Sequence, residues 1–180
     1  QCNESVHWKK ALDLDSTART ANGLSLIVLS RCLDNPNNVS VNVLATDIQK
    51  AKAFAADPRL KDVMDKSGVV SKPDIGYYHV VRFNPDSKET QWVTITHKVK
   101  DYAAWLKVYD GEGPSTRAAN GMVDVLLSRS VDDSNTVHIV FDIKDMAKAK
   151  ARMNSPELKK LMTNAGVTGA PKLEFYNKAE

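Results

Sequence analysis

The sequence predicts an α+β protein that contains two copies of one βαββαβ unit. Three observations lead to this prediction: an internal repeat, an alternation of strand and helix patterns within each copy, and a globular composition. The 180 residues are 42% hydrophobic and 26% charged. These values are typical of folded domains and not of disordered, collagen-like or coiled-coil chains.

The internal repeat has a period of 98 residues. Residues 17–78, placed on residues 115–176 without a gap, share 23 identities in 62 positions. A period of this length suits a small complete domain better than a solenoid unit. We therefore expect a first repeat over residues 1–83, a polar linker at 84–91 and a second repeat over 92–180.

The second repeat shows its element order most clearly. Alternating β-branched and polar residues predict strands, whereas acidic caps, helical spacing, proline and glycine predict helices. In chain order we expect a strand at 92–99, a helix after Asp101 that stops at 111–114, strands at 122–130 and 136–142, helices at 146–154 and 156–166, and a strand at 172–176. This order is that of a ferredoxin-like domain.

The first repeat follows the same order from Trp8 onwards, with strands expected at 24–32, 39–45 and 75–83. The counterpart of strand 92–99 would lie before residue 1. Either the N-terminus is shortened or the first sheet has three strands, so we expect seven strands in total. One face of the third strand of each repeat is apolar and should pack under the helices: Val39, Val41, Val43, Val137, Ile139 and Phe141. The opposite face is partly polar: Ser40, Asn42, His138 and Val140.

Part of the second repeat resembles a known superfamily. The segment Val-Thr-Ile-Thr-His-Lys-Val-Lys-Asp-Tyr-Ala-Ala-Trp at 93–105, followed by 119–121 and 137–141, is similar to dimeric α/β-barrel proteins of the antibiotic-biosynthesis monooxygenase-like type. Members are typically homodimers whose sheets close face to face. The resemblance implies that the two repeats form an intrachain pseudo-dimeric α/β barrel with a small-molecule ligand inside. It leaves further homodimerisation open and allows haem binding.

Two histidines are the candidate catalytic residues, because imidazole titrates near neutral pH. His97 shares its strand face with Val93 and Ile95, so a buried structural histidine is the alternative. His138 lies on the partly polar face, directed at the expected cavity.

Five further residues are candidate ligand-binding residues: Asn42, Trp105, Tyr109, Arg117 and Asp124. The alternative for Trp105 is a core aromatic, since it recurs at helical spacing in both repeats. The alternative for Arg117 is a pairing with a carboxylate or a carbonyl group. Asp124, which replaces Leu26 in mid-strand, would need a partner if buried.

Charge and motifs exclude several classes of function. A net charge of +3 gives little attraction to nucleic acid, and no apolar run approaches the length of a membrane span. No phosphate loop, nucleophile motif or metal-ligand spacing is present, so no motif requires a cofactor or metal. Cys2 allows export with a lipid anchor, although a cytoplasmic location is favoured.

Three functions of different classes follow. The first is a barrel that binds a small molecule without catalysis. The second is a cofactor-independent oxygenase acting on an aromatic substrate, with a histidine as the base, which the resemblance implies. The third is a structural module whose interior is packed core.

Overall fold

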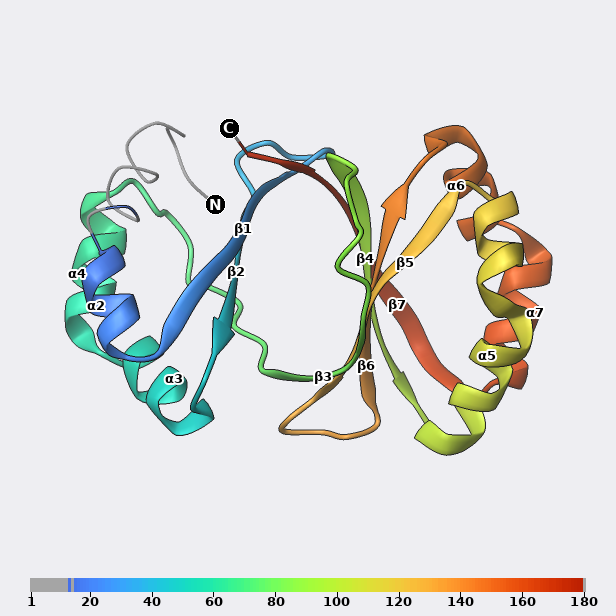
Figure 1. Cartoon of the computed structure of the whole chain (residues 1–180), viewed down its shortest axis with the longest axis horizontal. Helices are drawn as coiled ribbons and strands as arrows, with labels where there is room; N and C mark the ends of the chain where they lie inside the picture. Colours follow the sequence, from blue (N-terminus) through green and yellow to red (C-terminus); the bar gives the residue numbers. More distant parts are fainter. Residues whose placement is uncertain (1–12, 14, 180) are drawn as a thin grey trace. The chain divides into compact units, whose positions relative to one another are not determined.

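The computed structural model describes residues 13 and 15–179, which divide into two compact units (Figure 1). Unit 1 contains the described chain up to Ile75 together with its end from Asn177, and unit 2 is Gly76–Tyr176. Seven strands and six helices are present in the described residues, and the number of strands is the predicted one. The repeat boundaries at 83 and 92 rest on sequence likeness, not on compactness, and stay a prediction.

Unit 2 contains the elements of the second repeat and one strand from the first. Its elements are β3 (Tyr78–Phe83), β4 (Gln91–Val99), α5 (Tyr102–Ala119), β5 (Met122–Ser130), β6 (Thr136–Ile143), α6 (Met146–Met153), α7 (Pro156–Asn164) and β7 (Val167–Lys178), of which β7 continues past the unit boundary. The strand order is β7-β4-β6-β5-β3. The pairs β4–β6, β5–β6 and β3–β5 are antiparallel. The three helices lie together on one face of this sheet (Figure 1).

The core of unit 2 lies between that sheet face and the helices. Alternate residues of the central strands point into it, as the period-two pattern predicts. Val93 and Val137 are fully buried, and Ile95, Ile139 and Phe141 are at most 7% exposed. The intervening side chains of β4 and β6 lie on the opposite face of the sheet.

α5 consists of two helical segments, of which the sequence predicts only the first. The helix that begins after Asp101 is interrupted at Gly113, within the predicted stop, by a φ of 76°, a left-handed conformation that only glycine adopts readily. Pro114 then begins a second segment that reaches Ala119, at a position where its missing N–H costs nothing. This second segment is absent from the prediction.

Unit 1 contains the corresponding elements of the first repeat. They are α2 (Ser16–Ala21), β1 (Leu24–Cys32), β2 (Val39–Ala45), α3 (Ile48–Ala55) and α4 (Pro58–Lys66). Equivalent residues cap equivalent helices, because Asp47 accepts backbone N–H bonds at the start of α3 and Asp145 does so at the start of α6. The expected helix around Trp8, like Cys2, lies outside the described residues.

The expected burial of β2 is wrong. Val41 and Val43 are 41% and 39% exposed, whereas their counterparts Ile139 and Phe141 are each 4% exposed. In unit 2, β6 lies between two strands, with β4 on one side and β5 on the other. Among the described strands β2 pairs only with β1, so its apolar face lacks the flanking row of side chains that β4 supplies.

The closing strand of the first repeat pairs within unit 2, and the last residues of the second repeat belong to unit 1. The first repeat's strand begins at Tyr78, three residues later than expected, and β3 pairs with β5 in unit 2. At the end of the second repeat, the Ala179 N–H donates a 2.9 Å hydrogen bond to the Leu29 carbonyl in unit 1. Ala179 also packs against the Leu29 core there.

Candidate functional site

His97 lies on the helix-covered face of unit 2. Strand alternation in β4 places it on the same side as Val93 and Ile95, and its side chain is 7% exposed. The Trp105 ring of α5 meets the imidazole edge-on, with 5.7 Å between the ring centroids. His97 is therefore buried, as the alternative in the sequence analysis expects.

Neither ring nitrogen of His97 has a hydrogen-bond partner among the described residues. Burial lowers the pKa of His97 to about 4, so the ring is neutral at pH 7. A buried polar group without a partner costs roughly 1–3 kcal/mol, and such groups are rare in native structures. The imidazole is therefore available to a hydrogen-bonding group that these residues do not supply.

A row of aromatic rings leads away from His97 along α5. The rings of Trp105 and Tyr109 stack at 5.1 Å with an interplanar angle of 23°. The guanidinium carbon of Arg117 lies 4.2 Å from the centroid of the Tyr109 ring. Trp105 and Tyr109 are four residues apart and so share one face of the helix.

The row ends in an ion pair between the buried Arg117 and the half-buried Asp124. Arg117, 4% exposed, donates to both carboxylate oxygens of Asp124, at 2.7 and 3.0 Å. It also donates to the Tyr109 carbonyl at 3.0 Å, and the Tyr109 hydroxyl donates to Asp124 at 3.0 Å. Burial raises the pKa of Tyr109 well above its usual value, and the negative charge of Asp124 raises it further. The carboxylate and carbonyl partners considered for Arg117 are thus both present.

Two residues of this network carried no sequence signal. Glu112 lies 3.5 Å from Arg117 and accepts a 2.6 Å hydrogen bond from Arg152 of α6. The second contact joins residues forty positions apart, so no local spacing could have indicated it.

His138 lies on the other face of the same sheet. Its Nδ1 is 2.8 Å from the Thr96 hydroxyl, and its ring lies 4.9 Å from that of Tyr78 in β3. Burial lowers its pKa to about 4, against the opposing effect of Glu174. Because His97 and His138 lie on opposite faces of the sheet, they do not form one site.

The remaining candidate, Asn42, lies on β2 in unit 1. Its amide donates a 3.4 Å hydrogen bond to the Ser40 hydroxyl. The structure thus brings together four of the five candidate ligand-binding residues, all in unit 2: Trp105, Tyr109, Arg117 and Asp124.

Haem does not fit the surroundings of either histidine. An axial histidine must present a ring nitrogen to a space as large as the porphyrin. Both nitrogens of His97 are enclosed, and the ring of His138 is covered by Tyr78. Among residues 13 and 15–179, no cluster of three metal-ligating side chains occurs.

Within the part of the chain that the structure describes, no helix is both long enough and apolar enough to span a membrane.

No family model and no curated protein matches the sequence. Solved structures do match in fold. An anthrone oxidase-like protein aligns with a TM-score of 0.64 and 11% identity, over 99% of this chain and 88% of the other. An uncharacterised ferredoxin-fold protein related to antibiotic biosynthesis monooxygenases, from Listeria monocytogenes, aligns with a TM-score of 0.55 and 11% identity, over 98% of this chain and 90% of the other.

A third match belongs to a different functional class. A major regulator of staphylococcal pathogenesis aligns with a TM-score of 0.51 and 13% identity, over 94% of this chain and 92% of the other. The chain therefore shares the ferredoxin-like α+β fold of these structures, the fold that the resemblance implied. Since the matched proteins include oxidase-like and regulatory ones, the fold alone selects no activity.

Proposed function

We propose that this protein binds a small, largely apolar molecule in unit 2, with one polar group of that molecule hydrogen-bonded to His97. The observation that carries this proposal is the buried imidazole, whose two ring nitrogens have no partner among the described residues. Because both nitrogens are enclosed, the ligand must displace the side chains packed over the ring when it binds. A neutral imidazole has one donor and one acceptor nitrogen, so it can bind a hydroxyl or a carbonyl group.

The surroundings of His97 suit an aromatic ligand. Val93 and Ile95 supply apolar contact on the sheet, and Trp105 supplies an aromatic ring on the helix. Ligand sites of this kind are mostly apolar with few polar groups that fix orientation. Arg117 is already paired with Asp124, so we give it a positioning role and not a ligand-binding one. Its guanidinium holds Tyr109 in place through the Tyr109 carbonyl and ring.

Binding is a better match to this site than base catalysis. A pKa of about 4 makes His97 a poor proton acceptor at pH 7, and the same holds for His138. Lowering a histidine pKa from 6.5 to about 4 weakens its protonated form by about 3 kcal/mol.

The proposal can be tested with 1,8-dihydroxyanthrone as the probe, measured by calorimetry. This probe combines fused rings with hydroxyl and carbonyl groups, and one matched structure is anthrone oxidase-like. We expect saturable binding to the native protein, loss of binding in His97→Leu, and partial retention in His97→Asn, which keeps a hydrogen-bonding group. The exposed His79 provides the control His79→Leu, which should bind normally. Equal binding by His97→Leu and the native protein, or no saturable binding by either, contradicts the proposal.

A second candidate is oxygenation of such a molecule without a cofactor, favoured by the matches to oxidase-like and monooxygenase-related structures. The balanced reaction converts the CH₂ group of an anthrone and one O₂ into a quinone carbonyl and one water. We expect oxygen consumption above the buffer rate only if ligand binding raises the pKa of a histidine. An oxygen electrode distinguishes the two functions, since a binding protein leaves the buffer rate unchanged.

A further inference from the structure

One edge of β2 in unit 1 has no neighbouring strand among the described residues. β2 pairs with β1 from Val39 to Ala45, and no described strand pairs with its other edge. In unit 2 the equivalent edge of β6 is covered, because β4 pairs with it from Trp92 to Lys98. The two units therefore differ by one strand at equivalent edges.

The side chains of β2 suit a covered position. Val41 and Val43 are 41% and 39% exposed, and Leu44, on the other face of the strand, is 54% exposed. Edge strands that stay free usually carry lysine, proline or an inward-pointing charge, which discourages pairing with other chains. The segment Val-Ser-Val-Asn-Val-Leu-Ala at 39–45 contains none of these. Its composition is that of an interior strand.

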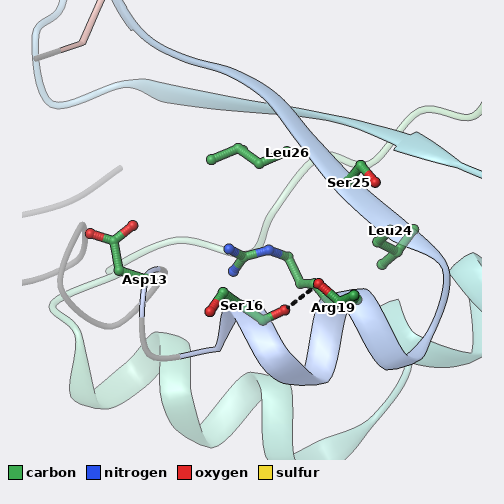
Figure 2. Close-up of a pocket in the computed structure, with 7 residues that line it drawn as sticks. Asp13, Ser16, Arg19, Leu24, Ser25 and Leu26 are labelled. Carbon is green, nitrogen blue, oxygen red and sulfur yellow. Dashed lines mark hydrogen bonds between the residues drawn. The ribbon is translucent and has the colours of Figure 1, made fainter.

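The partly exposed apolar face continues from β2 onto β1. Leu26 lies directly opposite Val43 in the pairing of these strands and is 40% exposed. With Leu24, it lines a pocket of about 450 Å³ beside α2. Figure 2 shows both leucines on β1, with Ser16 and Arg19 on the neighbouring helix. This face is incompletely packed, since closed protein interiors contain few voids larger than a water molecule.

Residues 70–75 show the same difference between the units. Their counterparts at 168–173 belong to β7, the other strand beside β4. Residues 70–75 form no strand and are all exposed, with Val70 and Ile75 at 55% and 48%. Because β4 lies between β6 and β7, its equivalent place in unit 1 takes a single strand and not the edge of a second folded sheet.

We propose that β2 accepts one added strand, supplied by an extended peptide segment of a partner protein. The segment runs antiparallel to β2, as β4 does to β6. In this mode of recognition main-chain hydrogen bonds supply affinity, and side chains at alternate positions supply specificity. The surface lies in unit 1 and does not depend on the function proposed for His97.

The pairing of β4 with β6 specifies the side chains of that segment. β4 alternates apolar residues with threonines against β6. Transferred through the repeat, its apolar residues stand opposite Val41 and Val43, and its threonines stand opposite Ser40 and Asn42. The partner segment therefore has branched or aromatic residues at every second position, which complete the apolar face. Hydroxyl or amide side chains lie between them and hydrogen-bond Ser40 and Asn42.

A synthetic peptide with the sequence of residues 91–99 is the probe, because it carries this pattern. We expect calorimetry to show saturable binding of one peptide per chain, and amide hydrogen exchange to slow at least about tenfold within residues 39–45. The peptide with Ile95→Lys should bind at least about tenfold more weakly, because lysine replaces the apolar contact opposite Val41. No saturable binding, or slowing confined to the edge strand at 78–83, overturns the proposal.

The variant Val41→Lys tests the surface from the protein side. We expect it to weaken binding of the unmodified peptide by at least about tenfold, because it places a charge on the edge strand, while cooperative unfolding in urea is retained. The control Ile27→Lys adds the same charge on β1, at a residue that is 61% exposed, and should bind the peptide normally. Native affinity in Val41→Lys, or the same loss in Ile27→Lys, overturns the assignment.

Measurements without peptide decide whether β2 is already covered. We expect amides of β2 to exchange faster than the equivalent amides of β6, since only β6 has strands on both sides among the described residues. Sedimentation then identifies the source of any unexpected protection. Equal protection of β2 and β6 in a monomer assigns the edge to another part of this chain, and equal protection in a dimer assigns it to a second copy. Either result overturns the proposal.

Discussion

Units 1 and 2 contain equivalent segments that are packed to different degrees. β2 and β6 occupy the same position in the repeat, yet Val43 is 39% exposed and Phe141 is 4% exposed. The helices of both units begin at equivalent caps, so local signals are not the cause. The described residues of unit 1 contain no counterpart of β4, the strand that lies beside β6 in unit 2.

The comparison teaches that one strand accounts for much of the burial. β4 contributes Val93, Ile95 and Val99 to the helix-covered face of unit 2, each at most 7% exposed. A central strand also covers the side chains of its neighbours, since a sheet face is buried by residues on adjacent strands as well as by helices. The same apolar pattern on β2 is therefore insufficient by itself to produce a closed core.

The largest expected effect concerns these equivalent core positions. Phe141→Ala should lower the free energy of unfolding by about 4 kcal/mol, because it removes a buried ring and leaves a cavity. Val43→Ala should lower it by less than about 1 kcal/mol, because the side chain is already partly solvated. Urea denaturation of both variants measures the difference. Similar losses of unfolding free energy in the two variants would mean that the side chains of β2 are as well buried as those of β6.

The next effect concerns the ion pair. Asp124→Leu gives unit 2 the residue of unit 1 and should lower the free energy of unfolding by about 3 kcal/mol, because Arg117 remains buried without its two-bond partner. Asp86→Leu, at an exposed position in the linker, should change it by less than about 0.5 kcal/mol. Urea denaturation again provides the measurement. An unchanged free energy of unfolding in Asp124→Leu would show that Glu112 alone is a sufficient partner for the Arg117 guanidinium.

Elements of regular structure could be predicted closely, because their signals are local. The strands at 24–32, 39–45 and 122–130 have the expected bounds, since β-branched alternation ends at turn residues in each case. The failures involve information from elsewhere in the chain. The helical segment from Pro114 to Ala119 was not predicted, and β7 begins at Val167, five residues earlier than expected.

The candidate site could be predicted only in part, for a similar reason. The row from Trp105 to Arg117 follows from helical spacing on α5, and Asp124 was notable as an acid in a strand. The contact between Glu112 and Arg152 joins two helices and has no signal in either. Strand alternation places His97 with apolar residues, but only the packing around it shows that neither nitrogen has a partner among residues 13 and 15–179.

A smaller effect would distinguish the units by their response to acid. All described histidines belong to unit 2, namely His79, His97 and His138. Because burial lowers the pKa of His97 to about 4 from an ordinary 6.5, the unfolded chain binds more protons than the folded one between these values. The free energy of unfolding is therefore unaffected by His97 above pH 6.5 and decreases as the pH falls toward 4. At pH 5 the decrease is about 2 kcal/mol.

Hydrogen exchange measured at pH 7 and pH 5 tests this prediction residue by residue. After correction for the intrinsic rates, protection should fall more in β4 and β6 of unit 2 than in β1 of unit 1. His97→Leu should reduce the pH dependence in unit 2, because leucine binds no proton in either state, whereas His79→Leu at an exposed position should leave it unchanged. An undiminished acid response in His97→Leu would assign it to His138, whose pKa burial also lowers to about 4. An equal response in both units would mean that they unfold together and that their unequal packing does not divide their stability.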